Sequence, residues 1–177
     1  MRIISGTLKG QIFDTPQGYR THPMSEKIRG ALFNILGDIE GLKILDAFGG
    51  SGGISLEAIS RGAGSVTIVE NDRIAQRTIE HNVAKFGLED KITLISANVS
   101  SWMNKNPDQK FDLVIADPPY DKLQYDLVEK LYTLLDDQGL LILSWPGKDR
   151  QIRMNHLKLV DRKDYGDAQL IFYSLIK

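Results

Sequence analysis

A glycine-rich segment between two strand patterns most constrains the fold of this chain. Residues 43–48 are mostly apolar, as in a buried strand, and the glycine-rich residues 49–53 follow directly. Residues 54–61 have a helical pattern, and a second apolar strand pattern, residues 65–69, comes next. A strand, a helix and another strand in this order form a βαβ unit. The segment therefore predicts a parallel sheet covered by helices.

This βαβ unit also predicts a nucleoside-binding site. Glycines let the main chain approach a ligand closely, and the N–H groups at a helix start point toward it. The second strand ends at Glu70, where an acid accepts hydrogen bonds from ribose hydroxyls. At the end of a later strand, the Asn98 amide is placed to bind an adenine edge or simply to form a turn. A tight turn followed by a surface glutamate remains the alternative for the whole unit.

Strand and helix patterns alternate along the rest of the chain. We expect a helix that Asn71 or Asp72 caps and that runs to Phe86, and further helices at 101–105 and 125–135, the last followed by a turn at 137–139. Strands are expected at 92–95, 111–116, 140–144, 157–160 and 170–175. The last two strands are too close in sequence for a helical crossover, so they are expected to be antiparallel. At the N-terminus, residues 2–5 and 11–13 predict a β-hairpin, and Ser25 predicts the start of a helix that ends at Gly37.

The sequence Asp117-Pro118-Pro119-Tyr120 follows the strand at 111–116. Neither proline has an N–H to donate, so the strand ends at Asp117 in a stiff turn. The Asp117 carboxylate and the Pro118 carbonyl then form two neighbouring acceptors beside an aromatic ring. Such a group suits an amino group on a planar ring, which donates to both acceptors while Tyr120 stacks on the ring. A turn that only ends the strand is the simpler alternative.

Composition excludes several classes of protein. The 177 residues fit one domain, there is no cysteine, and three histidines lie far apart, so a metal site is not expected. No apolar run approaches a membrane span and the N-terminus does not resemble a signal peptide, so we expect a cytoplasmic protein without membrane contact. The net charge is −1, which gives no overall basic field.

Basic residues are nevertheless concentrated at the start of the chain. Residues 1–30 contain five lysine or arginine side chains against two acidic ones. We expect Arg20, His22, Lys27 and Arg29 to contact nucleic-acid phosphates. An ordinary solvated face of the helix after Ser25 is the alternative.

Several motifs together resemble the RsmD family of bacterial small-subunit ribosomal RNA guanine-N2 methyltransferases. These are residues 2–6, 23–34, 46–52, 56–58, 60–63, 117–120 and 165–167. The resemblance implies an α/β fold with the Rossmann-like, mostly parallel sheet of class I methyltransferases, and S-adenosylmethionine as cofactor. The chain departs from the family pattern at three places: His22 replaces the usual arginine, Gly30 the usual glutamate, and Ser144-Trp145 stands where an acidic residue is common.

The resemblance assigns roles to particular residues. The expected cofactor-binding residues are Asp46, Phe48, Gly49, Gly50, Ser51, Gly52, Glu70, Asn71, Asn98 and Val99, and the expected catalytic residues are Asp117, Pro118, Pro119 and Tyr120. Residues 1–177 form one methyltransferase domain, with 1–37 as an RNA-contacting extension and 38–177 as the catalytic core. The modest charge favours ribosomal RNA within a partly or fully assembled small subunit as the substrate.

Three other functions are weighed against this one. A nicotinamide dehydrogenase would use the glycines and Glu70, but Ser55 occupies the position of the third glycine of that motif, and the Asp-Pro-Pro-Tyr turn has no role in hydride transfer. A non-catalytic RNA-binding module would need only the basic N-terminus. An amino-methyltransferase that acts on DNA adenine or cytosine, or on a protein glutamine, would use the same site.

Overall fold

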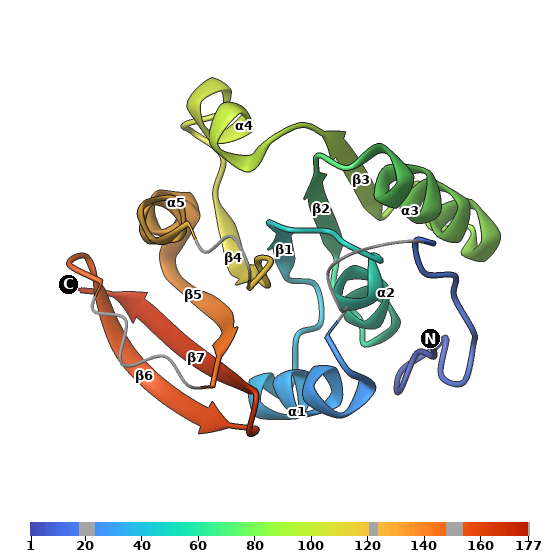
Figure 1. Ribbon diagram of the computed structural model, residues 1–177, viewed down its shortest axis with the longest axis horizontal. Helices are drawn as coiled ribbons and strands as arrows, with labels where there is room; N and C mark the ends of the chain where they lie inside the picture. The colour runs from blue at the N-terminus through green and yellow to red at the C-terminus, as the bar shows by residue number, and fades with distance from the viewer. Residues whose placement is uncertain (18–23, 121–123, 148–153, 177) are drawn as a thin grey trace.

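A seven-stranded sheet in the order β3-β2-β1-β4-β5-β7-β6 forms the centre of the molecule. The computed structural model describes residues 1–17, 24–120, 124–147 and 154–176 (Figure 1). The strands are β1 (Lys43–Asp46), β2 (Ser65–Glu70), β3 (Ile92–Ser96), β4 (Phe111–Ala116), β5 (Leu135–Pro146), β6 (Leu157–Asp164) and β7 (Ala168–Leu175). The first five are parallel. β6 and β7 pair antiparallel, as the sequence predicts, and β7 also pairs antiparallel with β5.

Helices cover both faces of this sheet (Figure 1). They are α1 (Glu26–Leu36), α2 (Gly53–Ser60), α3 (Arg73–Phe86), α4 (Val99–Lys105), α5 (Tyr125–Lys130) and the 3₁₀ helix η1 (Leu131–Leu134). The first three pack on one face with Ile44 of β1, while α4, α5 and η1 pack on the other face with Leu45. Successive strand residues point to opposite faces, so each central strand contributes to two cores.

The helix starts follow local capping chemistry. Ser25 accepts a hydrogen bond from the N–H of Ile28 at α1, and Asp72 accepts from Ile74 and Ala75 at α3. These bonds satisfy backbone donors that have no partner inside the helix. The expected start and end of the first helix, including Gly37 after its last residue, are confirmed.

The segment before β5 differs from its sequence prediction. A helix to residue 135 and a turn at 137–139 were expected. In the structure α5 ends at Lys130, η1 continues to Leu134, and the strand β5 already begins at Leu135. The pairing of β4 with β5 shifts between Phe111↔Leu135 and Leu113↔Leu140, so the expected turn residues form an irregularity inside the strand. A Cβ on Gly139 would lie 2.9 Å from the Phe111 carbonyl oxygen, so the absence of a side chain there permits this close pairing.

The expected N-terminal hairpin is reduced to one antiparallel bridge, Arg2↔Ile12. Backbone hydrogen bonds still join the two arms, from Ile3 to the Gln11 carbonyl and from Phe13 to the Met1 carbonyl. Ile4 and Ser5 instead donate to the Glu57 carboxylate of α2. The N-terminal segment is therefore a short, irregular hairpin whose first arm is also bonded to α2.

Within the described residues, no helix has the length and apolarity to cross a bilayer. The same part of the chain contains no group of three His, Cys, Asp or Glu side chains arranged as metal ligands.

Candidate active site

A cavity of about 700 Å³ lies at the carboxyl ends of the parallel strands. This volume falls in the range of small-molecule sites, and this end of the sheet is where open α/β folds bind ligands. Its walls include most of the glycine loop, Glu70 and Asn71, the whole 117–120 turn, the start of α1 and the turn after β6. The structure thus brings the two motifs that the sequence places about 65 residues apart into one site.

The glycine loop is shaped by close contact with β2 and α3. A Cβ on Gly49 would overlap Ile68 Cγ2, which leaves no room for a side chain. Gly50 has a φ of +54°, a left-handed conformation that glycine adopts easily, and its nearest neighbour for a Cβ is 3.9 Å away. Gly50 therefore exposes its main chain to the cavity, whereas Gly49 fixes the loop on the sheet.

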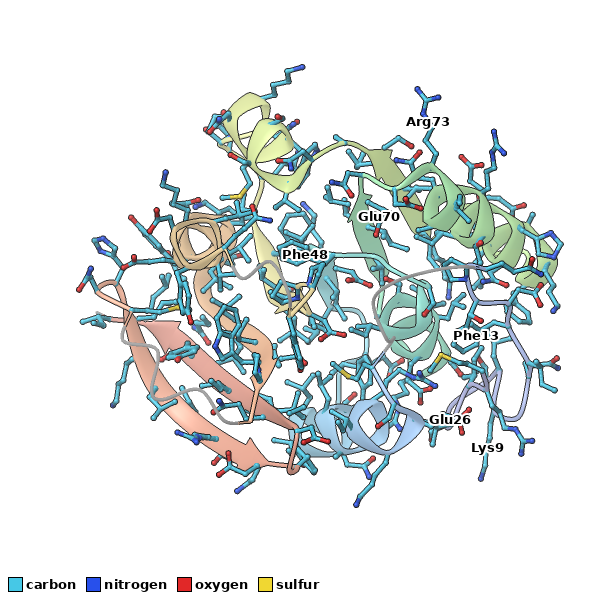
Figure 2. All side chains as sticks on the ribbon, viewed as in Figure 1. Lys9, Phe13, Glu26, Phe48, Glu70 and Arg73 are labelled. Carbon is cyan, nitrogen blue, oxygen red and sulfur yellow. The ribbon has the colours of Figure 1, made fainter. Side chains whose placement is uncertain are left out.

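Glu70, the last residue of β2, is held by three backbone N–H groups. Oε2 accepts from Gly50 at 2.7 Å, and Oε1 accepts from Asn71 at 2.8 Å and from Asp72 at 2.7 Å. Burial raises the pKa of this carboxyl, and the three hydrogen bonds oppose that effect. One lone pair of Oε2 remains available for a ribose hydroxyl. Figure 2 shows Glu70 and Phe48 at the same end of the sheet.

Asp46, the last residue of β1, contacts residues on both sides of the glycine loop but does not line the cavity. Its carboxylate is fully buried, accepts a hydrogen bond from Ser55 Oγ at 2.7 Å and lies near the backbone N–H of Phe48. Burial raises its pKa to about 7. Asp46 therefore joins the end of β1 to α2 and acts on the ligand site through the loop.

The Asp117-Pro118-Pro119-Tyr120 turn forms the opposite wall of the cavity. Burial raises the pKa of Asp117 to about 6, and a hydrogen bond from Ser144 opposes the rise. The Tyr120 hydroxyl lies 2.9 Å from Ser144 Oγ, while the residue as a whole is 40% exposed. Ser144 in β5 thus contacts both the carboxylate and the aromatic residue of the motif.

Asn98 and Val99 lie at the carboxyl end of β3 but do not line the cavity. The Asn98 side chain caps α4 by accepting a hydrogen bond from Ser100 at 2.9 Å, and Val99, the first residue of α4, is buried in the core. An adenine contact by Asn98 stays a prediction. Of the other expected cofactor residues, Gly52 does not line the cavity, and the following do: Phe48, Gly49, Gly50, Ser51, Glu70 and Asn71.

The expected phosphate-binding residues have different environments. Arg20 and His22 lie outside the described residues, and Lys27 is exposed on α1. Arg29 is 1% exposed, with Nε 3.6 Å from the Glu57 carboxylate, so the prediction of a surface phosphate contact at this position is wrong. The side chain points inward because α1 packs its Arg29 side against α2.

The structure adds cavity residues that the sequence argument did not use as site residues. Ser144 and the segment around Tyr165 and Asp167 reach the cavity from β5 and from the turn between β6 and β7, while Met24 and Ile28 reach it from α1. Two features of the sequence could have indicated these residues. Ser144 departs from the family pattern at the end of a predicted strand, and residues 165–167 form one of the family motifs.

Comparison with known proteins places the chain in a family. The model of the family described as "Conserved hypothetical protein 95" matches residues 1–174. Ribosomal RNA small subunit methyltransferase D of Buchnera aphidicola is 32% identical over 137 residues, which cover 77% of this chain and 70% of that protein. The protein of the same name from Escherichia coli K12 is 31% identical over 142 residues, covering 80% and 69%.

This chain belongs to the RsmD family. Two solved structures extend the comparison to the fold. Hypothetical protein TTHA0928 of Thermus thermphillus superimposes with a TM-score of 0.85 at 27% identity, covering 99% of both chains. SMU.776, a structure in complex with SAH, has a TM-score of 0.63 at 16% identity, covering 84% of this chain and 48% of that one. The class I methyltransferase sheet is confirmed. S-adenosylmethionine stays the expected cofactor.

Proposed function

We propose that this protein transfers a methyl group from S-adenosylmethionine to the exocyclic N2 amine of a guanine in small-subunit ribosomal RNA. The observation that carries the proposal is the single cavity lined by both the glycine loop and the 117–120 turn. One wall suits a nucleoside cofactor and the other suits an amine on a planar ring. The names of the relatives support ribosomal RNA of the small subunit as the substrate.

The residues of the first wall fit S-adenosylmethionine, which supplies an electrophilic methyl group on sulfur. The main chain at Gly50 is open to the ligand, and Glu70 Oε2 keeps one acceptor site for a ribose hydroxyl. A side chain at Gly49 would displace the loop from β2. The loop and the acid therefore bind and orient the cofactor.

The residues of the second wall position the acceptor amine. The Asp117 carboxylate and the Pro118 carbonyl accept its two N–H bonds, which turns the nitrogen lone pair toward the methyl group. The ionised carboxylate also stabilises the positive charge that develops on nitrogen. Tyr120, anchored by Ser144, provides a flat surface on which the base stacks. With the cofactor bound, the S–CH3 bond would break as the N–CH3 bond forms, S-adenosylhomocysteine would be released, and the methylated nitrogen would lose its extra proton to water.

The N-terminal extension, residues 1–37, supplies an exposed basic surface in this proposal. Arg2, Lys9 and Lys27 are exposed in the described part of that segment. Because the net charge of the chain is only −1, we propose a partly or fully assembled small subunit, in which other components add contact surface, as the substrate.

The test begins with ribosomal RNA from cells that lack the gene. Mass mapping should find one guanine without its N2 methyl group, and re-expression of the parent protein should restore it. The Asp117→Ala variant, expressed at the same level, should not. An intact methylation pattern, or a lost methyl group on DNA or on a protein, would refute the proposal. Purified protein with naked RNA and with small subunits would then identify the form of the substrate.

A further inference from the structure

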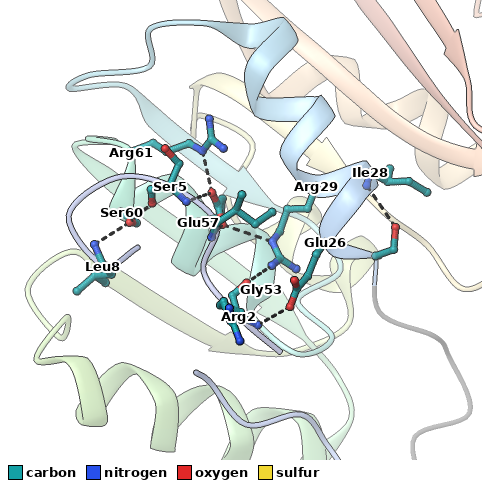
Figure 3. Close-up of polar contacts among 12 residues, drawn as sticks. Arg2, Ser5, Leu8, Glu26, Ile28, Arg29, Gly53, Glu57, Ser60 and Arg61 are labelled. Atoms are coloured by element: carbon teal, nitrogen blue, oxygen red, sulfur yellow. Dashed lines mark hydrogen bonds and ion pairs between the residues drawn. The ribbon is translucent and has the colours of Figure 1, made fainter. Parts of the chain in front are cut away.

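A buried carboxylate with two arginine partners lies directly behind the cavity. Glu57 of α2 is fully buried and accepts backbone hydrogen bonds from Ile4 at 2.8 Å and Ser5 at 3.1 Å (Figure 3). Arg61 Nε lies 2.8 Å from Glu57 Oε1, and Arg29 Nε lies 3.6 Å from Oε2. One negative charge thus faces two positive charges, and the closer pair is with Arg61.

The two arginines differ in what else they face. Arg61 is 14% exposed on its side chain, and its guanidinium also donates to Asn34 at the surface. Arg29 is 1% exposed and lines the cavity, whereas Arg61 does not. Burial lowers the pKa of the Arg29 guanidinium, and Glu57 opposes the effect, but arginine stays charged in proteins. Because Glu57 lies closer to Arg61 than to Arg29, it compensates the charge of Arg61 more fully. The remaining positive charge of the cluster therefore lies at Arg29, on the cavity wall.

The guanidinium of Arg29 is fixed in direction by its neighbours. Nη2 donates to the Arg2 carbonyl at 2.5 Å, the Phe13 ring lies 5.5 Å from Cζ, and Nε has no hydrogen-bond partner among the described residues. Nη1 points to the start of α2: a Cβ built on Gly53 would lie 3.3 Å from Nη1 and 3.2 Å from Ser51 Oγ. A cation, a hydroxyl and the positive end of a helix thus converge where Ser51 and Gly53 line the cavity.

Such a combination favours an anion. We propose that Arg29, with Ser51, binds the α-carboxylate of the methionine portion of S-adenosylmethionine. The inference rests on the proposed cofactor and assigns its amino-acid end to the side of the glycine loop away from Glu70. Carboxylates prefer the planar donors of arginine, and a carboxylate there would compensate the excess charge of the Glu57 cluster. Glu26 also faces Arg29 electrostatically, but it is exposed and bonds to the Arg2 N–H.

The first measurement needs no variant. Calorimetric titration of the parent protein with S-adenosylmethionine and with decarboxylated S-adenosylmethionine compares two ligands that differ in the carboxylate alone. A charged hydrogen bond of this kind should give about a 10- to 100-fold preference for the intact cofactor. Equal affinities would overturn the inference and leave the proposed function standing. Absence of binding by either ligand would overturn both.

The second measurement separates ligand binding from support of the fold. Arg29→Gln should lose the preference while its affinity for the decarboxylated ligand stays near the parent value. Arg29→Lys, which keeps a cation beside Glu57, should retain part of the preference. Arg61→Gln removes a charge from the same cluster outside the cavity and should keep the full preference. If Arg29→Gln kept the preference, or if both glutamine variants weakened both ligands equally, Arg29 would serve only as a partner of Glu57.

Discussion

The two ends of the cavity each carry an acidic side chain at the end of a parallel strand, and the two are held differently. Glu70 accepts three hydrogen bonds from backbone N–H groups of its own loop and the glycine loop. Asp117 receives a hydroxyl hydrogen bond from Ser144, and burial raises its pKa to about 6. Both carboxylates keep acceptor capacity for a ligand, but the first is also bonded by three backbone N–H groups to its surroundings, whereas the second has one side-chain partner.

This difference matches the task proposed for each end. A cofactor site benefits from groups that are rigid before the ligand arrives, because ordering them on binding costs affinity. An acceptor site needs an oxygen whose interaction strengthens as charge develops on the substrate nitrogen. Changes near Glu70 should therefore affect binding, and changes near Asp117 should affect the rate of methyl transfer.

The largest effect is expected from Asp117→Ala. Loss of the carboxylate should slow single-turnover methyl transfer about 100- to 1,000-fold, because a donor or acceptor aimed at developing charge contributes this much in other enzymes. Asp117→Asn keeps one acceptor oxygen and should lose less. Calorimetry on the same samples should give parent-like cofactor affinity. A parent-like rate in Asp117→Ala would reduce the 117–120 turn to the end of a strand.

At the opposite end, Gly50→Val should weaken S-adenosylmethionine binding about 10- to 100-fold. The φ of +54° disfavours a branched side chain, and the side chain would occupy space that the ligand needs. The matched control is Gly62→Val, which has a φ of +104° and lies away from the cavity. It should lower the melting temperature while cofactor affinity stays unchanged. Equal losses of affinity in both variants would indicate a general effect of strain.

The rate of methyl transfer should fall about tenfold per pH unit in acid, because protonation removes the charge of the Asp117 carboxylate. Because burial raises the pKa of Asp117 to about 6, the ionised form that binds the amine is lost as pH falls below that value. The single-turnover rate should therefore fall on the acid side of pH 6, measured with saturating cofactor. Asp117→Asn should be slow and lack this acid limb. If Asp117→Asn showed the same fall in rate at acid pH, the titrating group would be a residue other than Asp117.

The smallest effect is expected from Ser144→Ala. Its hydroxyl bonds to Asp117 and lowers the pKa of that carboxyl, so its loss should move the acid limb of the rate profile to higher pH. At pH 7 the rate should fall only a few-fold, since the Ser144 hydroxyl acts on the amine only through Asp117, which stays mostly ionised at that pH. Tyr120→Phe removes the other partner of Ser144 and should leave the limb in place. An unshifted limb in Ser144→Ala would exclude this positioning role.

Much of the architecture follows from local sequence patterns. The glycine-rich loop, the Asp72 cap and the Pro118-Pro119 pair act through the backbone conformations and donors of their own residues, so their positions were predicted well. The sequence predicts the structure less well where the same apolar pattern is compatible with both a helix and a strand, as at residues 131–135. Leu131, Leu134 and Leu135 are buried in the structure, and the same apolar spacing suited a longer helix.

The sequence by itself determined which groups the active site contains: a glycine loop, an acid after the second strand and an acid followed by two prolines. Only the tertiary structure decided how these groups are paired. Arg29 looked like a surface cation because spacing along a helix does not say which neighbour covers it, and Glu57 of α2 covers this one. Ser144 lies beside Asp117 through the parallel pairing of β4 with β5, a contact between residues far apart in the chain. Charge compensation and strand pairing depend on such distant partners. They fix the direction of Arg29, and they supply the Ser144 hydroxyl that opposes the rise which burial causes in the pKa of Asp117.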